Sequence, residues 1–153
     1  MKLYIETSVP NMLFHDDAPD KQQATKMFFQ WVRMTSHEVY TSRVTYEELA
    51  DAPEPKRTLM VAALANVGAI ELETGDRELA LAEAYVQEGA LPVRYLADAL
   101  HAATAVCHRM DVVVSWNMRH LVNLWRVRRI NAVNLRLGWP TILVHTPEEV
   151  VDL

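Results

Sequence analysis

Residues 2–8 of the chain read Lys-Leu-Tyr-Ile-Glu-Thr-Ser, and this stretch indicates both a fold class and the place of a site. Residues 2–5 form a short apolar run that is typical of a buried strand. A carboxylate, Glu6, follows the run at once, and two hydroxyl residues, Thr7 and Ser8, come next. Ligands of open parallel sheets bind just beyond the carboxyl ends of the strands, so Glu6 stands where chemistry is expected. The alternative role for Glu6 is to cap the following helix, which Thr7 or Ser8 would do better.

Short apolar runs alternate with amphipathic stretches along the rest of the chain, which predicts an α/β fold with a mostly parallel sheet. The expected strands are residues 2–5, 38–43, 69–72, 112–115 and 141–144. The expected helices are residues 21–35, a helical hairpin over 45–66, and residues 76–88, 96–109 and 121–137, with a last short turn capped by Thr146. No internal repeat interrupts this pattern, so residues 1–153 are expected to form a single domain.

The composition is that of a globular domain with an acidic balance. Half of the 153 residues are hydrophobic, 23% are charged, and the net charge is −5. This charge excludes a general electrostatic attraction to nucleic acid, so nucleic-acid binding would need a metal or a local basic face. One candidate face lies in the last third of the chain, although a solvated pair of helices is the simpler interpretation; its residues are Arg119, His120, Arg126, Arg128, Arg129 and Arg136.

The single cysteine, Cys107, excludes an internal disulfide and a cysteine-based zinc site, and it is expected to be a small core residue. The chain enters a strand directly after Met1, and no apolar run has the length of a signal peptide or a membrane span. These features predict a cytoplasmic protein without a membrane association.

Three further segments supply oxygen ligands at the end of an element or the start of a helix: Glu47-Glu48, Asp98 and Asn117. Thr45 and Glu48 also match a capping box, which would occupy Glu48 with capping. Glu47 is expected to face solvent. Asn117 follows the central strand, where it would either cap a helix or hold a metal or a metal-bound water.

Asp98 lies near the start of the apolar helix 96–109, and Ala102 and Ala105 share its face. That face is expected to be buried, and a buried carboxylate requires a partner or a metal. His101, one turn further on, would orient Asp98, bind a metal with it, or serve as a satisfied core histidine. Three acids and an amide suit Mg²⁺ or Mn²⁺, because these ions take oxygen ligands and lower the pKa of bound water.

Four segments, taken in order, resemble the PIN-domain family, which includes the VapC-type toxins of bacterial toxin–antitoxin pairs. They are residues 4–9 (Tyr-Ile-Glu-Thr-Ser-Val), 44–49 with Glu48, 97–105 with Asp98, and 113–117 with Asn117. The resemblance implies a three-layer α/β/α domain of about five short strands and a Mg²⁺- or Mn²⁺-dependent endoribonuclease. It also implies RNA as substrate, a small antitoxin protein as partner, and a homodimer.

The same resemblance assigns roles to individual residues. Glu6, Glu48 and Asp98 take the family's acidic positions and, with Asn117, would hold the metal and support catalysis. The family usually has Asp at the first of these positions, and Glu6 resembles a subgroup that shares the Glu. Thr7, Ser8, Ser115, Arg119 and His120 are expected to contact substrate, with His101 in support. Trp116 would stack on a base or, more commonly for such a position, pack in the core.

Two other interpretations remain open at this stage. The chain is either a PIN-like module that binds RNA or protein without cutting, which Asn117 and the acidic charge favour, or a doubly wound nucleotide-handling protein whose acids cap helices. The lack of a Gly-rich phosphate loop argues against the second.

Overall fold

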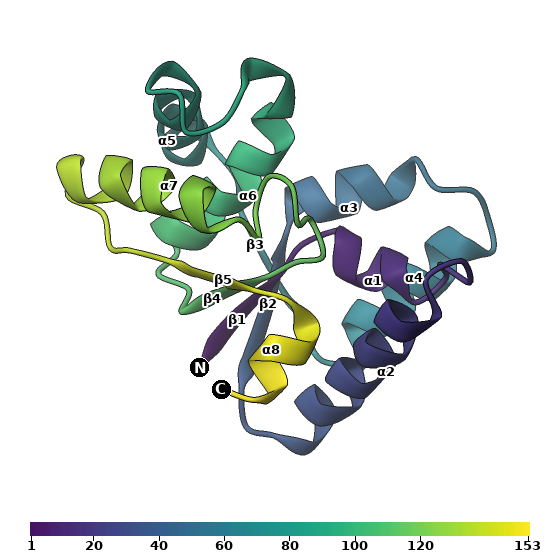
Figure 1. Ribbon diagram of the computed structural model, residues 1–153. Coiled ribbons are helices and arrows are strands. Elements are labelled where there is room, and N and C mark those ends of the chain that lie inside the picture. Colours follow the sequence, from purple (N-terminus) through teal and green to yellow (C-terminus); the bar gives the residue numbers. More distant parts are fainter.

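The computed structural model describes all residues 1–153 and has a central five-stranded sheet in the order β3-β2-β1-β4-β5 (Figure 1). Every neighbouring pair of strands is parallel. The strands are β1 (Lys2–Ile5), β2 (Glu38–Ser42), β3 (Ile70–Leu72), β4 (Val112–Val114) and β5 (Leu143–His145). The predicted parallel α/β sheet of five short strands is therefore confirmed.

Helices cover both faces of this sheet, which gives the predicted three layers (Figure 1). One face is covered by α5 (Asp76–Gln87), α6 (Leu96–Cys107) and α7 (Leu124–Arg136). The other face is covered by α1 (Ser8–Met12), α2 (Pro19–Met34), α4 (Lys56–Asn66) and α8 (Pro147–Val151). Helix α3 (Arg43–Ala50) follows β2 directly, and a 3₁₀ turn, Val93–Tyr95, leads into α6.

Strand β1 is buried on both faces because successive side chains point in opposite directions. Leu3 and Ile5 belong to the core under α2 and α4, while Tyr4 belongs to the core under α5 and α6. All three side chains are fully buried. This two-sided burial explains why β1 is a continuous apolar run and has no polar alternation.

The strand order places a topological switch point in the middle of the sheet. From β1 the chain builds β2 and β3 on one side, and it then crosses to place β4 and β5 on the other side. Connections that leave in opposite directions open a crevice at the carboxyl ends of the two strands between them, here β1 and β4. Glu6 follows the first of these strands and residues 115–117 follow the second.

Several helix boundaries differ from the prediction, and one helix was not predicted. Helix α3 begins at Arg43, so Thr45 lies inside its first turn and the predicted capping box with Glu48 is wrong. Helix α7 begins at Leu124, because the side chain of Asn123 accepts hydrogen bonds from two backbone N–H groups of its first turn. The five-residue helix α1 was not predicted. The predicted cap at Thr146 is confirmed, and Glu149 completes a capping box with it.

None of the helices combines the length and the apolar character that crossing a bilayer requires.

Thr45 provides a test of the revised start of α3. Its hydroxyl is buried without a hydrogen-bond partner, whereas the equally buried hydroxyl of Thr41 donates to the carbonyl of Ile5 at 2.9 Å. We expect Thr41→Val to lower the free energy of unfolding by about 1–3 kcal/mol, because it leaves the Ile5 carbonyl without this donor. Thr45→Val should leave that free energy unchanged or raise it by about 1 kcal/mol. Urea denaturation of both variants measures the difference, and an equal loss in the two would contradict the start of α3 described above.

Candidate active site

Glu6 is the most deeply buried acid at the carboxyl ends of the central strands, with 4% of the residue exposed. Its Oε1 accepts hydrogen bonds from the Ser8 backbone N–H at 3.0 Å, from Ser115 Oγ at 2.8 Å, and from Ser8 Oγ. Its Oε2 has no protein partner and is not sealed from solvent. Burial raises the pKa of Glu6, and the charge of His101 and the hydrogen bonds only partly oppose this effect. One oxygen is thus fixed by the protein and the other is left open.

Glu48, on α3, lies at the same edge of the sheet. As in Glu6, one of its carboxylate oxygens is hydrogen-bonded and the other is not. Its Oε1 accepts a hydrogen bond from Thr7 Oγ1 at 2.9 Å and contacts His101 Nε2 at 2.5 Å. No hydrogen bond occupies Oε2, and 40% of the side chain is exposed. Burial opposes ionisation, but the His101 and Thr7 contacts outweigh it and lower the pKa of Glu48. Glu47 points away and pairs with Arg43 at 2.9 Å, as its predicted exposure requires.

His101 lies between these acids and is only 1% exposed. Its Nδ1 is 2.7 Å from the hydroxyl of Tyr4, which is itself 2.7 Å from Ser42 Oγ. Burial disfavours the charged imidazole, but Tyr4, Glu48 and Glu6 together raise the pKa of His101 to about 10. His101 is therefore a satisfied buried histidine, which is one of its predicted roles, and its carboxylate partner is Glu48 and not Asp98. Tyr4 and Ser42 were not predicted, and the only signal was a hydroxyl within an apolar strand.

Asp98 and Asn117 form the other part of the site. Burial raises the pKa of Asp98; the positive charges of His101 and His120 and a hydrogen bond from the Asn117 side chain oppose the rise, and Glu48 adds to it. The Asn117 Oδ1 accepts a hydrogen bond from the His120 backbone N–H at 3.0 Å. The predicted helix cap at Asn117 is wrong, because residues 118–121 form a turn and Asn123 caps α7; the Asn117 amide instead closes this turn and contacts Asp98.

The three carboxylates meet around His101, but they do not form a ready-made set of metal ligands. No group of three or more His, Cys, Asp or Glu side chains is arranged to hold one ion. The sequence predicts that three acids converge directly on a shared ion, but the three carboxylates are not arranged in this way in the structure. The open Oε2 atoms of Glu6 and Glu48 are nevertheless hard oxygen donors, and Mg²⁺ commonly takes one or two carboxylates and completes its shell with water. The donor chemistry fits such an ion.

The hydroxyl residues expected to contact substrate serve the acids. Thr7 donates to Glu48, and Ser8 and Ser115 donate to Glu6. Ser115 is fully buried and also accepts the Asn117 backbone N–H at 2.9 Å. The structure therefore leaves Ser115 no surface for substrate, and its observed role is to orient Glu6.

His120 and Arg119 also separate into two roles. His120 is buried, and its ring stacks on Tyr95 with 3.6 Å between ring centroids. Burial lowers the pKa of His120, and nearby arginines add to this effect against the charge of Asp98. Arg119 is exposed and makes no ion pair. The guanidinium of Arg94 also lies over the Tyr95 ring, 5.0 Å from its centroid. Tyr95 and Arg94 therefore lie beside the predicted contact residues, and the imidazole of His120 is buried against Tyr95.

Most of the predicted basic face is used within the fold. Arg126 and Arg129 donate to the carbonyls of Ala90 and Gly89, and Arg136 pairs with Glu88. These acceptors lie at and just beyond the end of α5, where a helix exposes free carbonyls and attracts positive charge. The arginines of α7 therefore fasten two helices together, which is the simpler of the two interpretations of the sequence.

Trp116 and Cys107 are core residues, as expected. Trp116 is buried, and its Nε1 donates to Thr25 Oγ1 at 2.8 Å, so it offers no free face for stacking. Cys107 is buried, and burial raises the pKa of its thiol to about 11, which leaves it unreactive at neutral pH.

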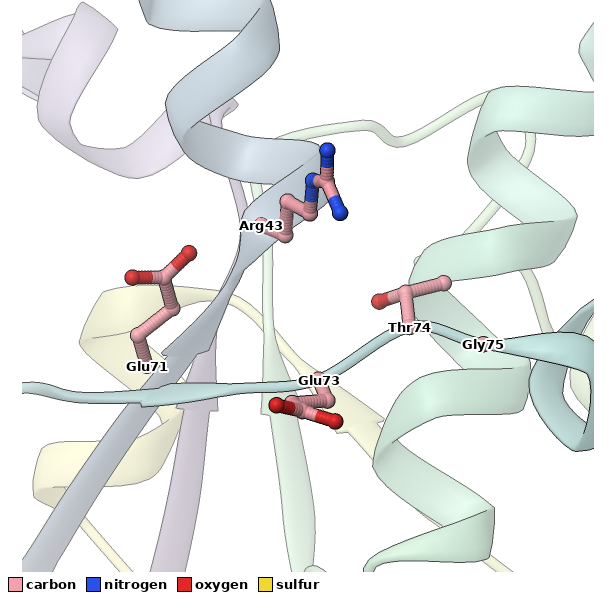
Figure 2. A pocket seen from close by; sticks show the side chains of 5 residues that line it. All are labelled: Arg43, Glu71, Glu73, Thr74 and Gly75. Carbon is pink, nitrogen blue, oxygen red and sulfur yellow. The ribbon is translucent and has the colours of Figure 1, made fainter.

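A separate cavity of about 510 Å³ lies beyond the ends of β2 and β3 (Figure 2). It is lined by Arg43, Glu71, Glu73, Thr74 and Gly75, without an apolar side chain. Figure 2 shows that Arg43 and the two glutamates point in different directions. No sequence pattern indicated this cavity, and its side chains do not converge on a common point (Figure 2).

Comparison with known proteins supports the fold. No protein-family model and no curated protein sequence matches the chain. Among solved structures, chains of three VapBC proteins are similar over most of their length. VapBC2 from Rickettsia felis, bound to a promoter DNA fragment, gives a TM-score of 0.59 at 10% identity, covering 95% of this chain and 98% of the other. DNA-bound VapBC from Salmonella typhimurium gives a TM-score of 0.59 at 17% identity, and VapBC-1 from nontypeable Haemophilus influenzae gives a TM-score of 0.57 at 12% identity. Each of these two alignments covers 96% of this chain and 98% of the other chain. The chain therefore has a VapC-like PIN-domain fold.

The buried charge of Glu6 should cost stability. Because the pKa of Glu6 is raised in the folded state, the unfolded chain loses this proton first as the pH rises, and folding stability falls over that range. We expect Glu6→Gln to remove this loss and to raise the free energy of unfolding at pH 7 by about 1 kcal/mol. The exposed Glu73→Gln should change it by less than about 0.5 kcal/mol. Thermal denaturation between pH 4 and pH 8 measures both, and a Glu6→Gln variant less stable than wild type at pH 7 would contradict the assignment.

Proposed function

We propose that the protein is a divalent-metal-dependent endoribonuclease, with Mg²⁺ or Mn²⁺ as its cofactor, and the toxin component of a toxin–antitoxin pair. The observation that carries this proposal is the arrangement of Glu6 and Glu48 at the switch point of the sheet. Each carboxylate has one oxygen held by the protein and one left open, and Asp98 with Asn117 lies within electrostatic reach. A bound Mg²⁺ would polarise a phosphoryl oxygen and lower the pKa of a bound water.

The protein's own residues would prepare the site before substrate arrives. Ser8 and Ser115 hold the carboxylate of Glu6, while Thr7 and His101 hold that of Glu48. Holding the ligands in advance reduces the entropy lost when an ion and a substrate bind. Asn117 would keep Asp98 oriented toward the same space.

RNA is the proposed substrate because the exposed groups next to the acids suit a flexible strand. Arg119 is exposed and unpaired, and Arg94 lies over the half-buried ring of Tyr95. Guanidinium groups bind phosphate. Single-stranded or looped RNA presents its phosphates on a flexible backbone without melting a duplex.

A small antitoxin protein and a second copy of the chain are the proposed partners. The neighbouring structures are VapBC proteins, and two of them are bound to DNA. Their fold similarity to this chain supports the same kind of assembly here, acting in the cytoplasm. Transfer of this role rests on the fold and on the retained acids.

A second candidate is a PIN-like module that binds RNA or protein without cutting. The observation that favours it is the lack of three preassembled metal ligands, together with an amide at position 117 where a carboxylate would add charge. Metal binding distinguishes the two candidates, because only the nuclease requires it.

The test measures Mn²⁺ binding by calorimetry and Mg²⁺-dependent cleavage of a single-stranded RNA pool, with Glu47→Gln as a matched control for Glu48→Gln. We expect wild type to bind Mn²⁺, and Asp98→Asn and Glu48→Gln to weaken this binding at least tenfold and to reduce cleavage by at least 100-fold. Glu47→Gln should match wild type, because Glu47 faces solvent. Wild type that binds no Mn²⁺ at millimolar concentration and still binds RNA would replace the nuclease with the binding module.

A further inference from the structure

Tyr4 is a polar side chain in the most enclosed part of the sheet. Its ring is fully buried in β1, and its hydroxyl lies 2.7 Å from Ser42 Oγ and 2.7 Å from His101 Nδ1. A phenylalanine would fill nearly the same space without a hydroxyl that needs partners. The hydroxyl therefore serves the two polar groups that it joins, one on β2 and one on α6.

His101 extends this connection to the candidate site. Its other ring nitrogen, Nε2, contacts Glu48 Oε1 at 2.5 Å. Both ring nitrogens are thus occupied, one by a residue of the central strand and one by a candidate metal ligand. The Tyr4 ring also packs edge-on against the imidazole, with 5.9 Å between centroids. The imidazole has no freedom to turn without losing a hydrogen bond.

Glu48 needs such support because its helix leaves it at the surface. With 40% of its side chain exposed, it has several rotatable bonds and little packing of its own. Fixing a glutamate side chain costs conformational entropy. The buried partners restrict this freedom when the protein folds, so the cost does not fall on cation binding.

We propose that Ser42, Tyr4 and His101 form a buried hydrogen-bonded relay that orients Glu48 for a divalent cation, with Tyr4 and His101 as positioning residues. This inference rests on the proposed metal-dependent function and specifies which core residues support it. Groups that orient a metal ligand typically change metal affinity by 10–100-fold when they are removed.

The protein contains a matched control for this relay. Tyr85 is also a fully buried tyrosine whose hydroxyl donates to a single side chain, Asn134, but it belongs to α5 and makes no contact with the acids. Replacing either tyrosine with phenylalanine removes one buried hydroxyl. Any loss of general stability should therefore be similar in the two variants, and only Tyr4→Phe should affect the cation.

The experiment compares Mn²⁺ binding by calorimetry for wild type, Tyr4→Phe and Tyr85→Phe, and it also follows the metal-free proteins by proton NMR. We expect Tyr4→Phe to weaken Mn²⁺ binding about tenfold and Tyr85→Phe to leave it unchanged. Without metal, the slowly exchanging imidazole N–H signal of His101 should be present in wild type and Tyr85→Phe, and broadened or lost in Tyr4→Phe and Glu48→Ala. Equal Mn²⁺ affinity in wild type and Tyr4→Phe would overturn the relay while the metal site stands. Absence of Mn²⁺ binding in wild type would overturn both proposals.

Discussion

A buried histidine among three carboxylates is the interaction on which the candidate site depends. Parallel strands bring their carboxyl ends to one edge, so any acids placed there are crowded and repel one another. Glu6, Glu48 and Asp98 all feel the positive charge of His101, which has no access to water. This counter-charge offsets part of the repulsion among the three acids. The hydrogen bonds of Ser8 and Ser115 to Glu6, and those of Thr7 and His101 to Glu48, leave one oxygen of each glutamate open.

Much of the fold was predictable because buried strands appear in the sequence as short continuous apolar runs. Strands β1 and β4 are continuous apolar runs because both of their faces are covered. The errors lie where local patterns compete. Leu121 continues the apolar spacing of α7 toward its N-terminus, yet the side chain of Asn123 starts the helix. Helix α1 is only five residues long, too short for a periodic pattern to appear.

The acidic residues of the site could be predicted from the sequence, but the hydrogen bonds that join them to other residues could not. Glu6 and Asp98 were identified from their positions at element ends, which the sequence displays directly. Glu48 also matched a capping box, and only the start of α3 at Arg43 shows that its carboxylate is available. The contact between Tyr4 and His101 joins residues 97 positions apart, and no local pattern reports such a pair.

The net charge of −5 can be reconciled with the proposed RNA substrate when the position of each arginine is considered. Most of those on α7 are bound to the end of α5, so Arg94 and Arg119 are the positive groups left near Asp98. Two guanidinium groups displace few counterions from a phosphate backbone, so in the proposed nuclease the remaining attraction would come from a divalent ion at the acids. Binding of an RNA strand would then depend steeply on the concentration of the divalent ion and only weakly on monovalent salt. A protein that bound RNA through a basic surface would depend strongly on monovalent salt and only weakly on the divalent ion.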